Sequence, residues 1–377
     1  KIKKFGTENL PSAQPFYVYA NQLLQAQAPG AYTKPGKTSI RVLCSMGALM
    51  KVILKQNALE TAAQLKKIIS KTATTLTPRG IEAAATELDL YVNAHAKHNS
   101  QVWQDGESLM GDERIECYKN LRIGGEWDVT KMYNQSKRVQ CFEQLSQIPE
   151  LRSLYANMIL LYANPVHMFY YHDRSHTIEQ DTMNEGLIIG DETAAYASFH
   201  ALDALMKRVA DELKLRTTMQ GTTYNAHADN VLMSGTAENV LRLADATQKD
   251  GAYDFSNGAT ILVMFDDTAN GTTEPPPNAV EVREVLAAMN ILTTGEELGD
   301  VKVTTTGARI LGTPVGTDAF KTQYLKTILE EQRKCFEILY ATPGVPPKSA
   351  LDVGKEMQGK MSFLMGTVTP NIAKPIA

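Results

Sequence analysis

The sequence lacks the long apolar stretch that a membrane-spanning helix requires. No segment approaches the roughly 18 to 20 consecutive apolar residues that cross a bilayer, so we expect no association with a membrane. The four cysteines are scattered without a Cys-x-x-Cys pair, which argues against a zinc site and against a disulfide framework. That usage favours a reducing compartment, so we expect an intracellular protein, in the nucleus or an organelle, that is not secreted.

An excess of charge of one sign is also missing. The 38 lysines and arginines oppose 42 acidic residues, for a formal net charge of −4. This balance argues weakly against broad nucleic-acid binding, although a local basic groove fits within a near-neutral total. With 43% hydrophobic and 21% charged residues, the 377-residue chain has a globular composition and is long enough for two or three packed units. It starts at Lys1 without a signal-peptide pattern, so we expect a processed protein or part of a longer one.

The most informative stretch is the apolar run from Ile261 to Phe265, which leads directly into Asp266 and Asp267. A short apolar run bounded by turn residues is typical of a buried strand. Carboxylates about 4 Å apart repel by about 4 kcal/mol at an effective dielectric constant near 20. A bound Mg²⁺ removes that penalty, because hard cations take oxygen ligands. The alternative is a strand that ends in a solvated turn.

Two further segments carry candidate ligand-binding residues. Asp128 ends an expected strand, and Tyr133 follows where the chain turns toward a helix. The pair suits a ligand and a pocket wall, although an ordinary exposed aspartate explains the pattern as well. At Gly190 the missing side chain lets backbone approach a ligand closely. Asp191 beside it equally suits the N-terminus of a helix.

Apolar residues at helical spacing predict two helices that bear on the fold. One spans about 81–96, and its expected buried face carries Ile81, Ala84, Ala85, Leu88 and Val92. The other begins after Thr317, a suitable N-cap residue, and its expected apolar face carries Phe320, Tyr324, Leu325, Ile328 and Leu329.

Taken in order, segments between about residues 38 and 345 resemble the reverse transcriptases of non-LTR retrotransposons. The stretch from Arg41 to Met50 is similar to the family's first fingers segment, with Val42 where proline is usual. Residues 77–84 are similar to its next fingers segment, and residues 309–316 resemble its Leu-Gly primer grip.

Three segments resemble the palm motifs of that family. Residues 128–134 look like the first catalytic motif, and Phe265-Asp266-Asp267 is similar to the aromatic-x-Asp-Asp motif, shortened by one residue. Residues 186–192 resemble the motif Gly-x-x-Gln-Gly-Asp-Pro, with Ile189 in place of glutamine and Glu192 in place of proline.

The resemblance implies an α+β fold with right-hand polymerase-like fingers and palm, in which an antiparallel sheet packs on helices, and a helical thumb-like C-terminus. We accordingly expect an N-terminal arm or linker over 1–37 and a fingers-like domain over 38–122. A palm-like domain is expected over 123–316 with an insertion at about 214–258, and a thumb-like helical segment over 317–377.

The activity that the resemblance implies is RNA-directed DNA polymerisation, with an RNA template and a DNA primer as partners. Two Mg²⁺ ions would be held by Asp128, Asp266 and Asp267, and Lys302 would donate a proton to pyrophosphate. Tyr133 would exclude a ribose 2′-hydroxyl. The other expected substrate-binding residues are Arg41, Gly190, Asp191 and Gly312.

A second segment competes for the role of the Asp-Asp motif. His227-Ala228-Asp229-Asn230 resembles its Tyr-Ala-Asp-Asp form, and the short separation of Asp229 from Gly190 favours it. The polar residues before Asp229 make a poor buried strand, and the gap between Asp266 and Leu311 suits one helix and one strand. We therefore expect Asp266 to be the ligand and residues 214–258 to be an insertion.

Two other interpretations of the whole chain stay open. Ile189, Glu192 and the mildly acidic total favour a catalytically inactive relative, an RNA- or protein-binding scaffold in a larger ribonucleoprotein assembly with structural RNA and partner proteins. Glu192 beside a template would repel phosphate, and polymerases that grip a duplex usually carry a basic excess. The third interpretation is an unrelated α/β metal-binding enzyme with an accidental Asp-Asp pair.

Overall fold

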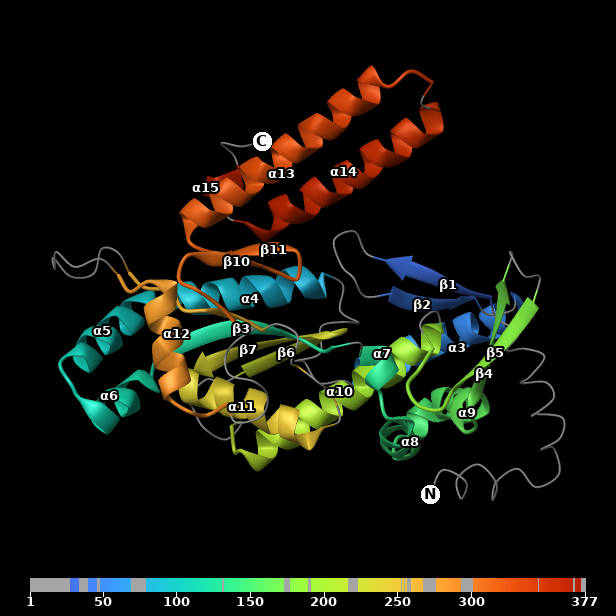
Figure 1. Cartoon of the computed structure of the whole chain (residues 1–377), viewed down its shortest axis with the longest axis horizontal. Helices are drawn as coiled ribbons and strands as arrows, with labels where there is room; N and C mark the ends of the chain where they lie inside the picture. Colours follow the sequence, from blue (N-terminus) through green and yellow to red (C-terminus); the bar gives the residue numbers. More distant parts are fainter. Residues whose placement is uncertain are drawn as a thin grey trace. The chain divides into compact units, whose positions relative to one another are not determined.

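The chain divides into two compact units, each described here by itself (Figure 1). Unit 1 comprises Lys1–Thr77, Val129–Ala210 and Thr247–Phe255, and unit 2 comprises Pro78–Asp128, Asp211–Ala246 and Ser256–Ala377. The structure is a computed structural model that describes residues 28–33, 40–45, 48–68, 79–130, 132–172, 177–188, 191–215, 223–251, 253, 255, 259–266, 276–292, 301–344, 346–368 and 370–373. Among the helices in these ranges, none is long and apolar enough to cross a membrane.

Unit 1 is rich in helices and carries two antiparallel hairpins. One hairpin pairs β1 (Ala28–Thr33) with β2 (Ile40–Ser45), and the other pairs β4 (Val166–His172) with β5 (Thr177–Met183). β1 lies inside the segment expected to be an arm, and Tyr32 pairs with Arg41. The helices are α3 (Ala48–Ile68), α7 (Met132–Gln135), α8 (Arg138–Ser146), α9 (Arg152–Tyr162) and α10 (Glu192–Glu212), with a 3₁₀ turn at Pro149–Leu151.

The long helix α10 supplies much of the core of unit 1. Its apolar stripe is fully buried at Phe199, Leu202, Met206 and Val209. Ser198 on the same helix lies 2.9 Å, oxygen to oxygen, from Ser136, which follows α7. This buried hydroxyl contact connects α7 to α10 and fixes their relative position more specifically than apolar packing alone.

His200 is a buried polar residue of α10 whose replacement should stabilise the protein. Its side chain is 6% exposed, and neither ring nitrogen has a hydrogen-bond partner. Burial lowers the pKa of His200, with a smaller opposing effect from Asp203. His200 therefore binds a proton more readily in the unfolded state than in the folded state. The free energy of unfolding consequently decreases as the pH drops below about 6.5.

We expect His200→Leu to raise the free energy of unfolding at pH 7.5 by about 1–2 kcal/mol, because it removes unsatisfied buried nitrogens. The gain should be larger at pH 5.5, where wild type also loses stability through the lowered pKa of His200. Urea unfolding at the two pH values measures both effects. A gain that is the same at pH 5.5 and pH 7.5 would contradict the linkage.

Unit 2 is built around a five-stranded sheet in the order β6-β7-β3-β8-β9. β3 (Arg122–Asp128) pairs antiparallel with β7 (Asn230–Thr236) on one side and with β8 (Ala259–Leu262) on the other. β6 (Thr223–His227) forms a hairpin with β7, and β9 (Lys302–Thr304) runs parallel to β8. Because residues 223–236 supply two strands of this sheet, the expectation that 214–258 is an insertion is wrong.

The connections between these strands follow a split β-α-β pattern. Along the chain, α7 to α10 and the β4–β5 hairpin lie between β3 and β6, and α11 (Ala237–Asp250) lies between β7 and β8. β3 is the first of these strands along the chain, and in the sheet it lies between β7 and β8. The fold is α+β, with a largely antiparallel sheet packed on helices.

The helix α4 (Gly80–Ala94) covers one face of the sheet, as Figure 1 shows. The predicted apolar face is confirmed at four of its positions, Ala84, Ala85, Leu88 and Val92, which are buried in one cluster with residues of the sheet and of the β10–β11 hairpin. A Cβ at Gly124 of β3 would lie 2.5 Å from Cδ1 of Leu88. Glycine at this position therefore lets α4 lie close to the strand.

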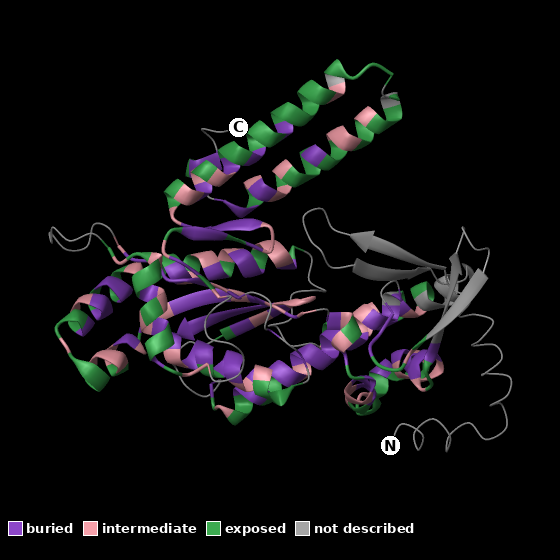
Figure 2. Ribbon diagram, in the orientation of Figure 1, coloured by how far each residue is buried: buried purple, intermediate pink, exposed green. Residues whose placement is uncertain are grey.

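A hairpin and a pair of long helices complete unit 2. β10 (Gly307–Ile310) pairs with β11 (Thr313–Gly316), and α13 (Asp318–Ala341) follows directly. The predicted cap is confirmed, because Thr317 Oγ1 accepts the backbone N–H of Phe320 at 3.2 Å. Buried residues of α13 and α14 (Pro347–Thr367) concentrate near β11, and the other ends are largely exposed (Figure 2). The remaining helices are α5 (Ala96–Glu107), α6 (Gly111–Tyr118), α12 (Ala279–Ala288) and α15 (Pro370–Ala373).

Candidate active site at one end of the sheet

The turn between β6 and β7 brings Asp229 to the end of the sheet where Asp128 lies. The last residue of β3, Asp128, lies directly opposite Asn230, and Asn230 lies opposite His227. Directly opposed residues share a face of the sheet, so these three side chains form a row across three strands. Asp229 precedes Asn230 in the turn, so it lies at the same sheet end as Asp128. The charges of Asp128 and Asp229, distant in sequence, both act on Glu126.

Asp266 lies at the opposite end of the sheet from Asp128, so the expectation that these two residues meet is wrong. β3 and β8 are antiparallel, with Gly124 opposite Leu262, so the chain continues from Leu262 away from Asp128. At strand spacing the separation is on the order of 20 Å. The backbone N–H of Asp266 donates to Ser100 Oγ at 3.0 Å, and Ser100 belongs to the helix over residues 96–107. On the same helix, Asn99 Nδ2 donates to the backbone carbonyls of Arg122 and Met264.

Glu126 adds a third carboxyl group near the first two. It lies two residues before Asp128 on β3, and side chains at this spacing share a face. The pKa of Glu126 is raised to about 7, mainly by burial and also by the charges of Asp128 and Asp229, while the backbone N–H of Leu311 and the Arg309 guanidinium act to lower it. Glu126 was not among the expected site residues, because the family motif begins at Asp128. Its spacing of two residues from Asp128 on a strand would have placed both side chains on the same face of the sheet.

Two hairpin turns near Glu126 hold residues in an uncommon backbone conformation. Ala228 has φ 53° at the tip of the β6–β7 hairpin, and Leu311 has φ 48° at the tip of β10–β11. Left-handed backbone costs a residue with a Cβ about 1–2 kcal/mol and persists where the surroundings impose it. The backbone N–H of Leu311 reaches Glu126 Oε1 at 3.4 Å. Tight hairpins of this length commonly require positive φ at a central residue of the turn, which accounts for both values.

The donors at this sheet end fit Mg²⁺ better than a metal that needs a complete protein cage. Within the described ranges, no three His, Cys, Asp or Glu side chains form a group that could hold a metal ion. Mg²⁺ commonly binds through one or two carboxylates, keeps water ligands and takes further oxygens from substrate phosphates. Asp128 and Asp229 are two carboxylates at this sheet end, and their charges add to the effect of burial in raising the pKa of Glu126.

The remaining expected site residues fall into three groups. Lys302 begins β9 opposite Thr260, which itself lies opposite Glu126, so it is at the Asp128 end of the sheet and its side chain is exposed. Gly312 follows Leu311 in the β10–β11 turn with φ 86°. Asp267 and Gly190 lie outside the described residues, and Arg41, Tyr133 and Asp191 belong to unit 1.

Asp191 is buried inside unit 1, with its carboxylate bound to protein groups. Its Oδ1 accepts the backbone N–H of Thr193 at 2.8 Å, which makes it the N-cap of α10. Its Oδ2 accepts the hydroxyl of Tyr162 at 2.6 Å. Asp191 thus lies at the N-terminus of a helix, as one interpretation of the sequence had it, and its expected contact with substrate stays a prediction.

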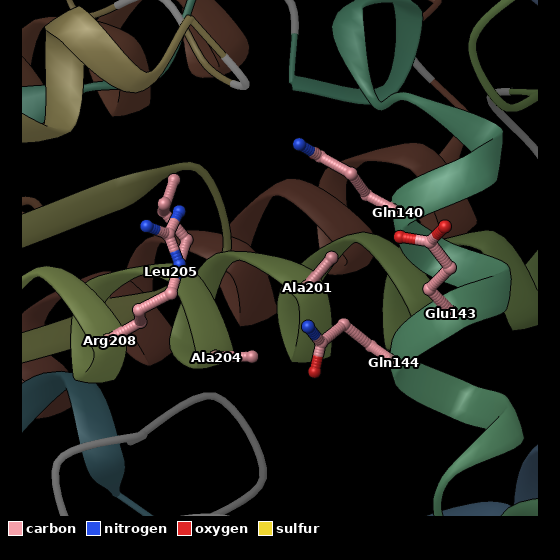
Figure 3. Close-up of a pocket in the computed structure, with 7 residues that line it drawn as sticks. All are labelled: Gln140, Glu143, Gln144, Ala201, Ala204, Leu205 and Arg208. Carbon is pink, nitrogen blue, oxygen red and sulfur yellow. The ribbon is translucent and has the colours of Figure 1, made fainter.

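A cavity of about 210 Å³ lies between α8 and α10 (Figure 3). Figure 3 shows its seven lining residues, of which Glu143 and Arg208 are charged. Arg208 forms an ion pair with Asp250 at 2.6 Å. The cavity thus has a single carboxylate, and paired carboxylates are found at the sheet end of unit 2. The seven residues are Gln140, Glu143, Gln144, Ala201, Ala204, Leu205 and Arg208.

Comparison with known proteins finds distant structural likenesses. No family model matches the sequence, and no curated protein matches it either. The structure of apo telomerase from Candida tropicalis, truncated from its C-terminal domain, matches with a TM-score of 0.31 and 11% identity over 60% of this chain and 47% of that chain.

The RNA-dependent RNA polymerase of a human picobirnavirus, an insertion-loop deletion mutant, matches with a TM-score of 0.37 and 10% identity. That match covers 61% of this chain and 40% of the polymerase chain. This chain thus spans less than half the length of either structure, and neither likeness assigns it a function.

Proposed function

We propose that unit 2 contains the palm of a nucleic-acid polymerase and that the chain is an RNA-directed DNA polymerase. The observation that carries the proposal is the register of β3 and β7, which sets Asp128 opposite Asn230 and so brings Asp229 to the same sheet end. The order of motifs along the chain supports the reverse-transcriptase form of this activity. The metal motif proposed here is His227 to Asn230 in place of Phe265 to Asp267.

In this proposal, Asp128 and Asp229 hold Mg²⁺ at the sheet end. Bound there, Mg²⁺ would activate the primer 3′-hydroxyl and neutralise charge on the departing pyrophosphate. Glu126, held by the Leu311 backbone, sets the position of the β10–β11 turn against the site. Lys302, exposed at the same end, would donate a proton to pyrophosphate.

Primer extension tests the proposal directly. The purified chain is given an RNA template, a DNA primer, deoxynucleotides and Mg²⁺, and a matched reaction contains EDTA. We expect incorporation that follows the template sequence and stops when the metal is chelated. Binding of primer and template without incorporation, at every Mg²⁺ and Mn²⁺ concentration, would contradict the proposal.

A catalytically inactive domain that binds structural RNA and partner proteins is the second candidate, and Asn230 favours it. The resembled motif has a second aspartate at this position, and an amide contributes no charge to cation binding. If the missing carboxylate is the cause of inactivity, Asn230→Asp should convert an inactive chain into one that incorporates nucleotides. Unchanged RNA binding and no incorporation in both forms would support the scaffold.

A further inference from the structure

The junction of α4 and α5 is held against the first residue of β3. The two helices meet at His95. Asn99, in the first turn of α5, accepts the backbone N–H of Arg122 at 2.7 Å and donates to its carbonyl oxygen at 2.8 Å. Arg122 lies two residues before Gly124, so its side chain is on the face of the sheet that α4 covers. These contacts set Arg122 beside the junction of the two helices.

Ring contacts bring two histidines to the same side of this junction. The centres of the His95 and His98 rings lie 6.4 Å apart, and the His95 ring also packs on Tyr91 with 4.5 Å between ring centres. His98 Nε2 lies 3.2 Å from the carbonyl oxygen of Asn120, so this nitrogen is the donor. The other nitrogen of His98, Nδ1, then donates to a ligand when the ring is protonated. Solvent reaches both rings, because His95 is half-buried and His98 is exposed.

The side chains that act on His95 are positively charged. Burial lowers the pKa of His95, and the charges of Arg122 and His98 lower it as well. Burial raises the pKa of Tyr91, and the Arg122 guanidinium opposes that effect, so the same guanidinium acts on both rings of the stacked pair. A bound anion would offset the repulsion among these cations and favour the protonated form of His95.

Two acidic residues belong to the same part of unit 2. Asp89, on α4, forms an ion pair with Lys321 at 2.6 Å. Asp266 follows β8, and its backbone N–H donates to Ser100 of α5. Among the described residues, the charges that act most on the pKa of His95 are nevertheless the two cations. The group therefore keeps its capacity for an external anion.

We propose that Arg122, His95 and His98 form a binding site for a phosphate group, which we call the phosphate site. A guanidinium fork suits a tetrahedral oxyanion, and the oxygens of one such group can also accept from both protonated rings. A carboxylate has only two oxygens and meets these three donors less well. The site lies at the start of β3, about 20 Å by strand spacing from Asp128 at its end. It is thus separate from the proposed catalytic carboxylates and goes beyond the proposed function.

Titration calorimetry of the full chain with sulfate tests the site, because sulfate keeps the same charge between pH 6 and pH 8. We expect sulfate to bind wild type more tightly at pH 6, since the anion favours protonated histidine. His98→Gln should weaken this binding about tenfold at pH 6, the effect of one lost hydrogen bond to a charged group. The glutamine amide can still donate to Asn120. Acetate that binds wild type as tightly as sulfate would overturn the assignment to phosphate.

Lys97→Gln is the matched control, because it removes an exposed positive charge from α5 next to His98. Its sulfate affinity should stay within about twofold of wild type. Arg122→Gln should weaken binding at both pH values, because the guanidinium stays charged throughout. Should Arg122→Gln fail to fold, the exposed position of His98 leaves that variant to decide. Equal effects of His98→Gln and Lys97→Gln would overturn the site, since general charge attraction would then explain the binding.

Competition separates the two sources of the phosphate group. Inorganic phosphate and a short single-stranded RNA without a terminal phosphate are each added to the sulfate-bound chain. Displacement by the RNA assigns the site to a nucleic-acid backbone, and displacement by phosphate but not by the RNA assigns it to a free phosphate. Displacement by neither overturns the proposal. These measurements need no activity, so a chain that binds sulfate at this site and incorporates no nucleotide contradicts the polymerase proposal alone.

Discussion

Replacing Asp229 by alanine is expected to lower template-directed incorporation by about 10³-fold, because metal-bound charge stabilisation supplies several kcal/mol and each 1.4 kcal/mol is a factor of ten. Asp128→Ala should have an effect of the same size, since the register of β3 and β7 puts both residues at the same end of the sheet. The measurement is single-nucleotide primer extension at saturating substrate, with circular dichroism to show that each variant is folded.

Asp266→Ala is the matched control for Asp229→Ala. It removes the same carboxylate from the end of another strand, at the far end of the sheet, so incorporation should stay within about threefold of wild type. The opposite ranking, with Asp266→Ala inactive and Asp229→Ala active, would overturn the site described here. Loss of activity in both variants with intact folding would show that neither position alone marks the metal site.

Replacing Lys321 by methionine is expected to lower the free energy of unfolding by about 3 kcal/mol, the usual cost of removing one partner from a buried ion pair. Lys321 Nζ lies 2.6 Å from Asp89 Oδ2, and the two side chains are 5% and 17% exposed. Asp89 Oδ1 also accepts the backbone N–H of Gly316 at 2.9 Å. The pair therefore joins α4, the end of β11 and the start of α13, and its loss leaves a largely buried carboxylate with fewer partners.

The free energies of unfolding of Lys321→Met and of its control, Lys326→Met, are measured by chemical unfolding and compared. Lys326 lies on the same helix with an exposed side chain, so its replacement should change stability by no more than about 0.5 kcal/mol. Equal, small effects of the two substitutions would mean that the Lys321–Asp89 pair contributes little net stability. The denaturant dependence should be the same in both variants, because neither alters the surface exposed on unfolding.

The buried faces of the helices could be predicted because they depend only on the spacing of apolar residues within a short segment of sequence. Ala84, Ala85, Leu88 and Val92 recur at the spacing of one helix face, and they are buried together in α4. The cap at Thr317 follows from the preference for a hydroxyl that accepts a free N–H at the helix start. These features depend on residues within a turn or two of each other, so no knowledge of distant pairing is needed.

The partner of Asp128 could not be predicted in the same way. The apolar run before Asp266 correctly indicates a buried strand, and β8 is buried at Ile261 and Leu262. Strand direction, however, decides which end of the sheet a terminal carboxylate occupies, and β8 runs opposite to β3. The polar residues of β6 argue against a fully buried strand. β6 is nevertheless part of the sheet, because it is an edge strand that pairs with β7 on one side.

The sequence by itself determined the face of α4 that packs on the sheet, the cap of α13 and Asp128 as a carboxylate at a strand end, and the α+β class followed from the family resemblance. The first three are short-range properties, set by side-chain periodicity and by backbone groups that need partners nearby. Only the tertiary structure decided that Asp229 and not Asp266 lies at the same sheet end as Asp128, and that Arg122 lies close to His95. Both results depend on register and burial between residues far apart in the chain, which local preference does not encode.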